Sequence, residues 1–176
     1  MPPDENSSQL ALIQCPGWGR ECPPYALACL AAYARREGFS ARCFDLNNDF
    51  YLAGGELRRM LEDKDYYSFW ESEGSVRGLL EDNAPLLDSF VERILASGAR
   101  VAGFTTHTTS FRVSLEVARR LKRKDPSVLV IFGGPQFYRA QAGRPFAEEP
   151  CVDAVVVGEG EAALVEILRR VSAGLP

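Results

Sequence analysis

The sequence has 176 residues, of which 46% are hydrophobic, and a formal net charge of -4 at neutral pH. This length and apolar content predict a single domain, residues 1–176, with a substantial core. The acidic balance argues against a nucleic-acid partner, because phosphate binding needs a concentrated basic face, and the basic run Arg119–Lys124 is expected to be a solvated helix end.

The first predicted elements are a strand, a helix and a strand. Before them, the amino terminus has neither the basic start nor the apolar core of a secretory signal. Residues Leu10–Cys15 form a short apolar run that predicts a buried strand. A helix is expected from near Pro24 to Gly38, because proline is tolerated in a first turn and glycine closes helices. Residues Ala41–Leu46 alternate as a second strand does.

The pattern changes between about residues 48 and 98. Two helical stretches, Glu56–Glu62 and Leu86–Ala96, flank the aromatic and acidic segment Asp65–Glu71. This region is too long for an ordinary connection and too apolar for a disordered linker. We therefore expect a helical insertion packed on the sheet, with its aromatic side chains in the core or in a partner interface.

Strands and helices alternate regularly after the insertion. The expected elements are the strand Arg100–Phe104, the helix Phe111–Lys124, the strand Val128–Phe132, a short helix near Arg139–Glu148, the strand Ala154–Val157 and the helix Glu161–Ser172. Five parallel strands with intervening helices predict a flavodoxin-like (Rossmann-like) doubly wound α/β fold with strand order 2-1-3-4-5. In that order, the loops after Cys15 and Phe104 frame the ligand crevice.

Two of these strands end abruptly in glycine, in the runs Ile131–Gln136 and Val155–Glu161. Both are expected to be buried on both faces of the sheet and to leave bare backbone where a large ligand can approach. Each glycine alone is explained by the turn from strand to helix. Two strands that end in glycine in consecutive strand–helix units favour a shared ligand site.

The loop after the third strand carries five hydroxyls and the only histidine of the chain, His107. Such a loop suits a phosphate or amide ligand, and it suits a helix cap at Thr109 or Ser110 equally well. A single histidine excludes a His-based metal cluster, and no nucleophile–base pair can be recognised. The sequence therefore predicts no catalytic residue, and His107 is expected to be a ligand contact or an exposed loop residue.

The cysteines and the hydropathy limit cofactors and location. The five cysteines form no Cys-x-x-Cys pair, and Cys15, Cys22 and Cys29 are spaced by seven, which fits no zinc or iron–sulfur signature. We therefore expect no metal centre made by this chain alone. No apolar run approaches the length of a membrane span, so we expect no membrane partner and a cytoplasmic location with reduced thiols.

Two common occupants of this fold are disfavoured by the loops. Flavodoxins bind flavin mononucleotide with a loop rich in Ser, Thr and Gly after the first strand, whereas this chain has Pro16–Pro24 there. Phosphoacceptor receivers need acidic residues at the ends of the first and third strands, and Gln14–Cys15 and Phe104–Thr105 supply none.

Several segments, taken in order, match one family. They are Pro23–Ala28, Gly38–Phe39, Asp45–Asn47, Val101–Thr105, Phe132–Pro135 and Val152–Glu161. With the insertion that contains Phe69–Glu71, this pattern resembles the N-terminal cobalamin (vitamin B12)-binding domain of cobalamin-dependent radical S-adenosylmethionine (SAM) enzymes. The resemblance covers nearly the whole chain.

The resemblance implies a slot for the nucleotide base of cobalamin, donors for its tail phosphate and a surface beneath the corrin. The residues expected to bind the cofactor are Trp18, Tyr25, Thr105, Thr106, His107, Thr109, Gly133, Gly134, Pro135, Gln136, Gly158, Glu159 and Gly160. The threonines and the Gly133–Gly134 pair are expected at the slot, and Gly158–Gly160, Trp18 and Tyr25 near the corrin. An acidic helix start explains Glu159 and Glu161 equally well.

The chain departs from related domains in two motifs. No Asp-x-His-x-x-Gly sequence follows the first strand, so no histidine ligand to cobalt is expected, and Trp18 or Tyr25 could cover the lower face. No Cys-x-x-x-Cys-x-x-Cys sequence is present, so the 4Fe-4S cluster and SAM of the family are expected in the parent protein rather than in this chain. Residues Ala173–Pro176 fall where a linker to a catalytic barrel would begin, which favours an excised domain.

The first hypothesis is a cobalamin-binding module, not catalytic alone, that presents base-off cobalamin without a histidine ligand to a radical SAM domain in cis. Methyl transfer is the expected reaction. The alternative is a structural and docking domain that has lost the cofactor, because such sheets are readily reused. A stand-alone enzyme that uses His107 is the third hypothesis.

Overall fold

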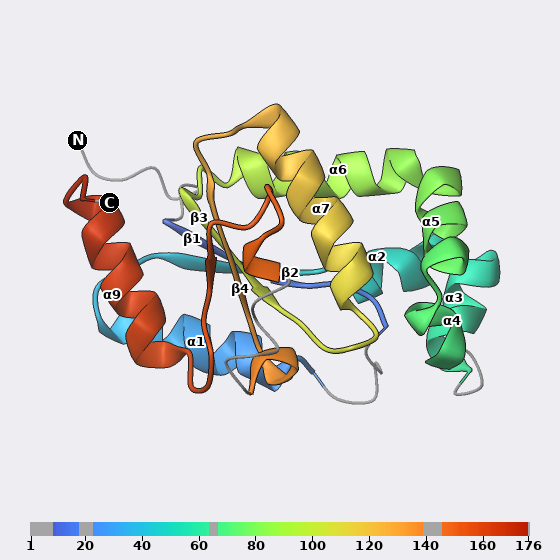
Figure 1. Ribbon diagram of the computed structural model, residues 1–176, viewed down its shortest axis with the longest axis horizontal. Helices are drawn as coiled ribbons and strands as arrows, with labels where there is room; N and C mark the ends of the chain where they lie inside the picture. The colour runs from blue at the N-terminus through green and yellow to red at the C-terminus, as the bar shows by residue number, and fades with distance from the viewer. Residues whose placement is uncertain (1–8, 18–22, 64–66, 139–145, 176) are drawn as a thin grey trace.

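Five parallel strands form one sheet in the order β2-β1-β3-β4-β5, which confirms the fold class and the strand order expected from the sequence. The strands are β1 (Leu10–Gln14), β2 (Ala41–Asp45), β3 (Val101–Thr105), β4 (Leu129–Gly133) and β5 (Ala154–Val155). The computed structural model (Figure 1) describes residues 9–17, 23–63, 67–138 and 146–175.

The helices follow the expected sequence of elements, with more of them in the insertion. They are α1 (Tyr25–Arg36), α2 (Leu46–Ala53), α3 (Gly55–Glu62), α4 (Tyr67–Glu71), α5 (Glu73–Asp82), α6 (Ala84–Ala96), α7 (Phe111–Lys124), the 3-10 turn η2 (Pro135–Phe137) and α9 (Glu161–Ser172). The bounds expected for α7 and α9 are confirmed. Residues 139–145 of the short helix expected near Arg139–Glu148 lie outside the described part of the chain.

Three helices of the insertion, α2, α5 and α4, were not expected from the sequence. The first, α2, begins directly after β2, where the Asp45 side chain accepts a hydrogen bond from the Asn47 backbone N–H at 3.0 Å. The second, α5, is capped by Ser72, which accepts from the Ser75 N–H at 3.4 Å. Asp and Ser are typical caps, but the polar residues of α2 and α5 hid their periodicity.

The last strand begins where the sequence predicts, but the expectation for its burial and length was wrong. The run around Val155 was expected to be a strand buried on both faces, but β5 has two half-exposed residues. It pairs only with β4, through Ile131↔Ala154 and Phe132↔Val155, so it is the edge of the sheet. The Val156 N–H still donates to the Phe132 carbonyl at 2.8 Å, and the next residue, Val157, is 42% exposed.

Helices cover both faces of the sheet (Figure 1). Helices α1 and α9 contact each other on one face, and α6 and α7 contact each other on the opposite face. The insertion reaches β1 through α2, whereas α3, α4 and α5 extend beyond the sheet (Figure 1), and α5 contacts α7. Trp70 of α4 is 3% exposed and belongs to the core. The aromatic side chains of the insertion were expected either in the core or in a partner interface, and for Trp70 the first of these is confirmed.

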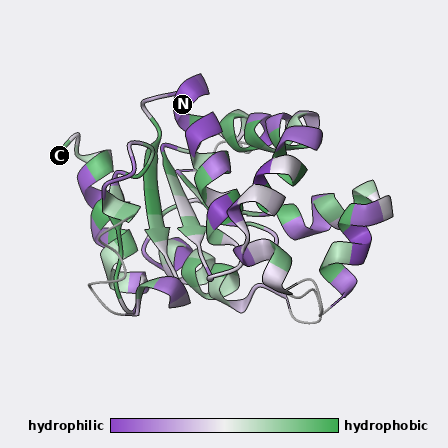
Figure 2. Ribbon diagram, turned by 45° about the vertical axis from the view of Figure 1, so that its right-hand side comes forward, coloured by the Kyte–Doolittle hydropathy of each residue, from purple (hydrophilic) through white to green (hydrophobic). Residues whose placement is uncertain are grey.

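Apolar residues concentrate in the strands, and hydrophilic residues lie along the surrounding helices (Figure 2). No helix in the described ranges is both long and apolar enough to cross a membrane.

Candidate functional site

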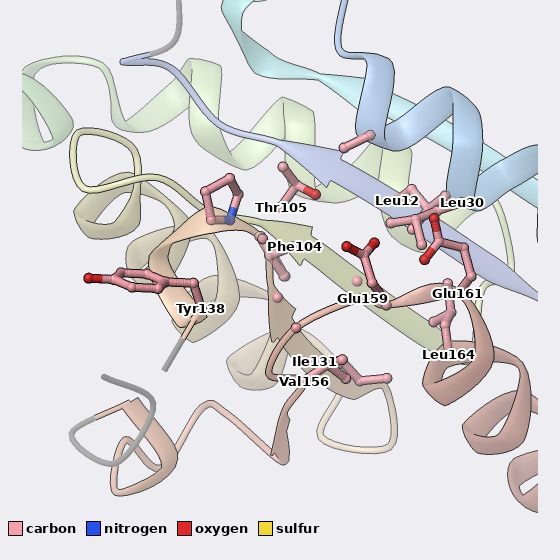
Figure 3. Close-up of a pocket in the computed structure, with 17 residues that line it drawn as sticks. Leu12, Leu30, Phe104, Thr105, Ile131, Tyr138, Val156, Glu159, Glu161 and Leu164 are labelled. Carbon is pink, nitrogen blue, oxygen red and sulfur yellow. The ribbon is translucent and has the colours of Figure 1, made fainter. Parts of the chain in front are cut away.

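A cavity of about 330 Å³ lies between the sheet and helices α1 and α9 and opens at the carboxyl ends of β3 and β4 (Figure 3). Its size falls within the range of small-molecule sites. The lining residues are Leu12, Ala26, Leu30, Gly103, Phe104, Thr105, Ile131, Gly133, Gly134, Pro135, Tyr138, Val156, Gly158, Glu159, Gly160, Glu161 and Leu164.

The floor of the cavity is a row of three residues across the sheet. Leu12 of β1 pairs in register with Gly103 of β3, and Gly103 pairs with Ile131 of β4. A Cβ atom on Gly103 would lie 3.3 Å from Leu12 Cδ2, so a side chain at this position of the cavity lining would crowd Leu12. Glycine in the interior of a strand weakens the strand, and it often marks close approach of a ligand.

The next row, at the carboxyl edge of the sheet, forms the rim. Thr105 pairs with Gly133, and a Cβ atom on Gly133 would meet only Val156 atoms at 3.8 Å or more. Gly134 has φ of +102°, and a Cβ atom there would lie 2.8 Å from Thr106 N, so only glycine fits. The two glycines therefore differ, because Gly133 leaves room for a ligand and Gly134 holds the backbone turn.

The hydroxyl-rich loop is fixed by its own side chains. Thr106 Oγ1 donates to the Gly133 carbonyl at 2.7 Å, and Thr109 Oγ1 donates to the Gly17 carbonyl at 2.6 Å. Ser110, the N-cap residue of α7, makes no side-chain cap and instead accepts from the His107 N–H at 3.0 Å. These hydroxyls thus join the loops after β1, β3 and β4.

Thr105 differs from its neighbours. Its side chain lines the cavity at 5% exposure. Within the described residues, its hydroxyl makes no hydrogen bond, so it is available to a ligand.

The charged groups of the cavity are acidic. Glu159 is exposed and Glu161 half-buried, and both come from the segment that begins α9. Figure 3 shows the Glu159 side chain directed across the cavity mouth and the Glu161 side chain directed toward α1. No lysine or arginine is among the described lining residues, so the cavity favours neutral ligands or hydrogen-bond donors over anions.

The structure brings together part of the expected set. Lining the cavity are Thr105, Gly133, Gly134, Pro135, Gly158, Glu159 and Gly160. Outside the lining lie Tyr25, Thr106, His107, Thr109 and Gln136. Tyr25 is 80% exposed beside the lining residue Ala26. Trp18 lies outside the described residues.

The apolar part of the lining was not expected from the sequence. It includes Leu12, Leu30, Gly103, Ile131, Val156 and Leu164. These residues resemble ordinary core positions, and only Gly103, a glycine inside an apolar strand, carried a signal that could have been recognised.

Burial shifts the pKa of two side chains near the ends of β1 and β3 toward their neutral forms. Burial raises the pKa of the Cys15 thiol to about 12, so it is not a thiolate ligand. Burial lowers the pKa of the half-buried His107, which favours the neutral imidazole. Within the described residues, no group of His, Cys, Asp and Glu side chains could hold a metal ion.

A family model for the B12 binding domain matches residues 18–168. The chain belongs to the B12-binding domain family. The match includes strands β2 to β5 but not β1, so the family assignment covers most of the fold that frames the cavity.

Solved structures support the fold. The radical SAM methyltransferase TsrM from Kitasatospora setae, with tryptophan and a SAM analogue bound, matches 96% of this chain and 27% of its own, at TM-score 0.57 and 20% identity. A second TsrM structure, with cobalamin and a 4Fe-4S cluster bound, matches 96% of this chain and 25% of its own, at TM-score 0.54 and 20% identity.

Two curated relatives match part of the chain. The 2-(S-pantetheinyl)-carbapenam-3-carboxylate methyltransferase of Streptantibioticus cattleyicolor is 40% identical over 68 residues, 39% of this chain. The cobalamin-dependent radical SAM methyltransferase TokK of Streptomyces tokunonensis is 37% identical over 68 residues, also 39% of this chain. The matched part is 10% of the length of each relative.

The cavity of this B12-binding domain suits part of a cobalamin molecule. A flat aromatic base needs a narrow apolar slot, and the row Leu12–Gly103–Ile131 with the open Gly133 provides one. The amide side chains of a corrin are hydrogen-bond donors, and the carboxylates of Glu159 and Glu161 are acceptors beside the mouth. The residues present therefore fit the cofactor that the family is named for.

Proposed function

We propose that this B12-binding domain holds cobalamin with its nucleotide base detached from cobalt and without a histidine ligand, and presents it to a radical SAM domain in cis. The observation that carries the proposal is the cavity itself, which penetrates from the rim at Gly133 to the floor at Gly103. A base that stays on cobalt would leave this cavity unfilled, whereas a detached base can enter it.

The absence of a histidine ligand is supported by the position of the only histidine. His107 lies outside the cavity lining, and its loop is held by the Ser110 hydroxyl. Cys15, at the end of β1 in the core of the opposite face, is kept protonated by burial, which raises its pKa to about 12. We assign the lower face to Trp18 or Tyr25, as the sequence predicts, and Tyr25 is 80% exposed at the start of α1.

When bound, cobalamin supplies a cobalt centre that can accept a methyl group and release it. In this proposal, Gly103 and Gly133 leave the cavity open to the base, and the Thr105 hydroxyl, which has no hydrogen-bond partner among the described residues, bonds the nucleotide. Glu159 and Glu161 accept hydrogen bonds from corrin amides. The chain's residues thus bind and orient the cofactor, and they supply no acid, base or nucleophile.

We assign methyl transfer to the parent protein on the support of the names of its relatives. Both curated relatives are named as methyltransferases, and the 68 residues matched are a tenth of their length. We place the 4Fe-4S cluster and SAM in a further domain of the same polypeptide, because this sequence has no Cys-x-x-x-Cys-x-x-Cys motif. The cytoplasm is the compartment we assign, since Cys15, Cys29, Cys43 and Cys151 are free thiols.

Binding can be tested with the purified 176-residue chain. The chain is mixed with hydroxocobalamin, separated from unbound ligand by gel filtration, and its visible absorption spectrum recorded. The proposal predicts stoichiometric cobalamin in the protein peak with a base-off spectrum. A colourless peak from folded protein, under both reducing and oxidising conditions, would instead support the cofactor-free docking domain.

The axial ligand is tested separately by electron paramagnetic resonance of the cob(II)alamin complex. A nitrogen ligand to cobalt splits the hyperfine lines into triplets. The proposal predicts no such splitting in the bound state. Triplets that persist in the wild type and disappear in His107→Ala would show that His107 is a cobalt ligand.

A further inference from the structure

The floor of the cavity points to a choice between nucleotide bases. We infer, on the basis of the proposed function, that the row Leu12, Gly103 and Ile131 makes this site selective for cobalamin with a dimethylbenzimidazole base over the analogue with an adenine base.

The deep end of the cavity offers no hydrogen-bonding side chain. The side chains there are aliphatic or absent: Leu12, Leu30, Gly103, Ile131, Val156 and Leu164. The backbone on this row lies inside the paired strands β1, β3 and β4. Polar lining side chains among the described residues lie at the rim, at Thr105, beside η2, at Tyr138, and at the α9 end, at Glu159 and Glu161. A polar group that reaches the floor therefore finds no side-chain partner among the described residues.

The two bases differ at the edge that enters first. The base is joined to its ribose through a ring nitrogen, so the edge remote from the ribose reaches deepest. In dimethylbenzimidazole this edge carries two methyl groups, which gain from burial against leucine and isoleucine. In adenine the six-membered ring carries two ring nitrogens and an amino group, and each one buried without a partner lowers affinity by about 5- to 100-fold.

Gly103 sets how deep a base can enter. Its Cβ position lies 3.3 Å from Leu12 Cδ2, so an alanine there occupies the space above the floor. The nearest atom belongs to a flexible side chain, so the strand can accept alanine after a small shift of Leu12. Gly103→Ala therefore shortens the slot without removing the rim at Thr105 and Gly133.

The experiment compares three corrinoids on the 176-residue chain by visible difference titration. The probes are hydroxocobalamin, its adenine analogue pseudocobalamin, and cobinamide, which has no nucleotide. The variants are Ile131→Thr, which adds a hydroxyl to the floor, and Gly103→Ala. The matched control is Gly78→Ala in α5, where a Cβ meets nothing within 4 Å. Thermal melting checks that each variant is folded.

The ratio of the pseudocobalamin and cobalamin dissociation constants is the readout. The free energy of detaching each base belongs to the free corrinoid, so it cancels when this ratio is compared between variants. We expect Ile131→Thr to lower the ratio at least about fivefold, because the hydroxyl pairs a polar group of adenine. If Ile131→Thr does not fold, the isosteric Val156→Thr makes the same test.

Gly103→Ala should raise the dissociation constants of both nucleotide-bearing corrinoids about tenfold or more, and change that of cobinamide by no more than about twofold. The Gly78→Ala control should bind all three corrinoids within about twofold of the wild type. If Ile131→Thr leaves the ratio of the pseudocobalamin and cobalamin dissociation constants unchanged, the proposed selectivity is wrong although cobalamin binding stands. The same conclusion follows if Gly103→Ala weakens cobinamide binding as much as it weakens cobalamin binding. If the folded wild type binds none of the three corrinoids, the proposed function fails as well.

Discussion

The two faces of the sheet are packed in opposite ways. The face covered by α2, α6 and α7 is filled with large side chains, and Phe50, Phe90 and Phe132 on it are at most 1% exposed. The face covered by α1 and α9 uses smaller residues, mainly leucine, alanine and valine, and it contains the cavity of about 330 Å³.

This difference separates stability from binding. Aromatic contacts such as the perpendicular Phe44–Phe90 pair, with ring centroids 6.3 Å apart, stabilise the filled face. On the hollow face, Gly103 and Gly133 give up packing and leave space. Changes on the first face should therefore reduce the free energy of unfolding, and changes on the second should reduce cofactor affinity.

The largest expected effect is loss of stability from the filled face. Phe90→Ala removes a ring that is 1% exposed in α6, and we expect the free energy of unfolding to fall by about 3–5 kcal/mol. Urea unfolding followed by circular dichroism measures this loss. Cobalamin affinity of the folded variant should stay within about twofold; a large drop in affinity would show that the faces are not independent.

The reverse effect is expected from Gly133→Leu on the hollow face. The added side chain has room at its Cβ, where the nearest atom is 3.8 Å away, so the fold should persist. It blocks the rim, and cobalamin affinity should fall about 100-fold or more, as expected when ~3 kcal/mol of contact is lost. Visible difference titration gives the affinity, with Gly74→Leu in α5 as the control. Unchanged binding would remove Gly133 from the site.

A smaller effect is expected at alkaline pH from Cys15, which lies in the core of the filled face. Burial raises its pKa from 9.0 to about 12, so the folded chain keeps this proton where the unfolded chain releases it. The free energy of unfolding should therefore fall by about 1.4 kcal/mol per pH unit as pH rises between these values. Urea unfolding at several pH values should show a shallower fall in Cys15→Ala. Parallel curves for both proteins would contradict this assignment.

The smallest effect is expected at the surface of the hollow face. Arg169 of α9 pairs with Glu37 at 2.8 Å, and the arginine side chain is 56% exposed. Arg169→Ala should cost at most about 1 kcal/mol of unfolding free energy, because exposed ion pairs contribute little. A loss above about 2 kcal/mol would mean that this pair, rather than apolar packing, holds α1 against α9.

The regular elements could be predicted because their signals are local. The amphipathic repeat of α7 and the glycine before α9 gave bounds that the structure confirms. The strand order followed from the alternation of strands and helices. The half-exposure of β5 was missed because its residues are apolar, although the expected strand order already placed this strand at the edge of the sheet.

The cavity was harder to predict because it depends on distant contacts. The rim residues Thr105 and Gly133 stand at strand ends, where the fold rule places ligands. The bond from Thr109 to the Gly17 carbonyl joins residues 92 positions apart, so sequence alone could not separate a ligand donor from a loop contact. The floor needs Leu12, Gly103 and Ile131 in register, which only the folded sheet shows.

A crystal structure of the 176-residue chain with hydroxocobalamin would test the central claim most directly. The account predicts the benzimidazole ring between the sheet and helices α1 and α9, above Gly103 and beside Gly133, with no histidine on cobalt. A corrin held at the surface with its base still on cobalt, and the cavity empty of the nucleotide, would contradict it.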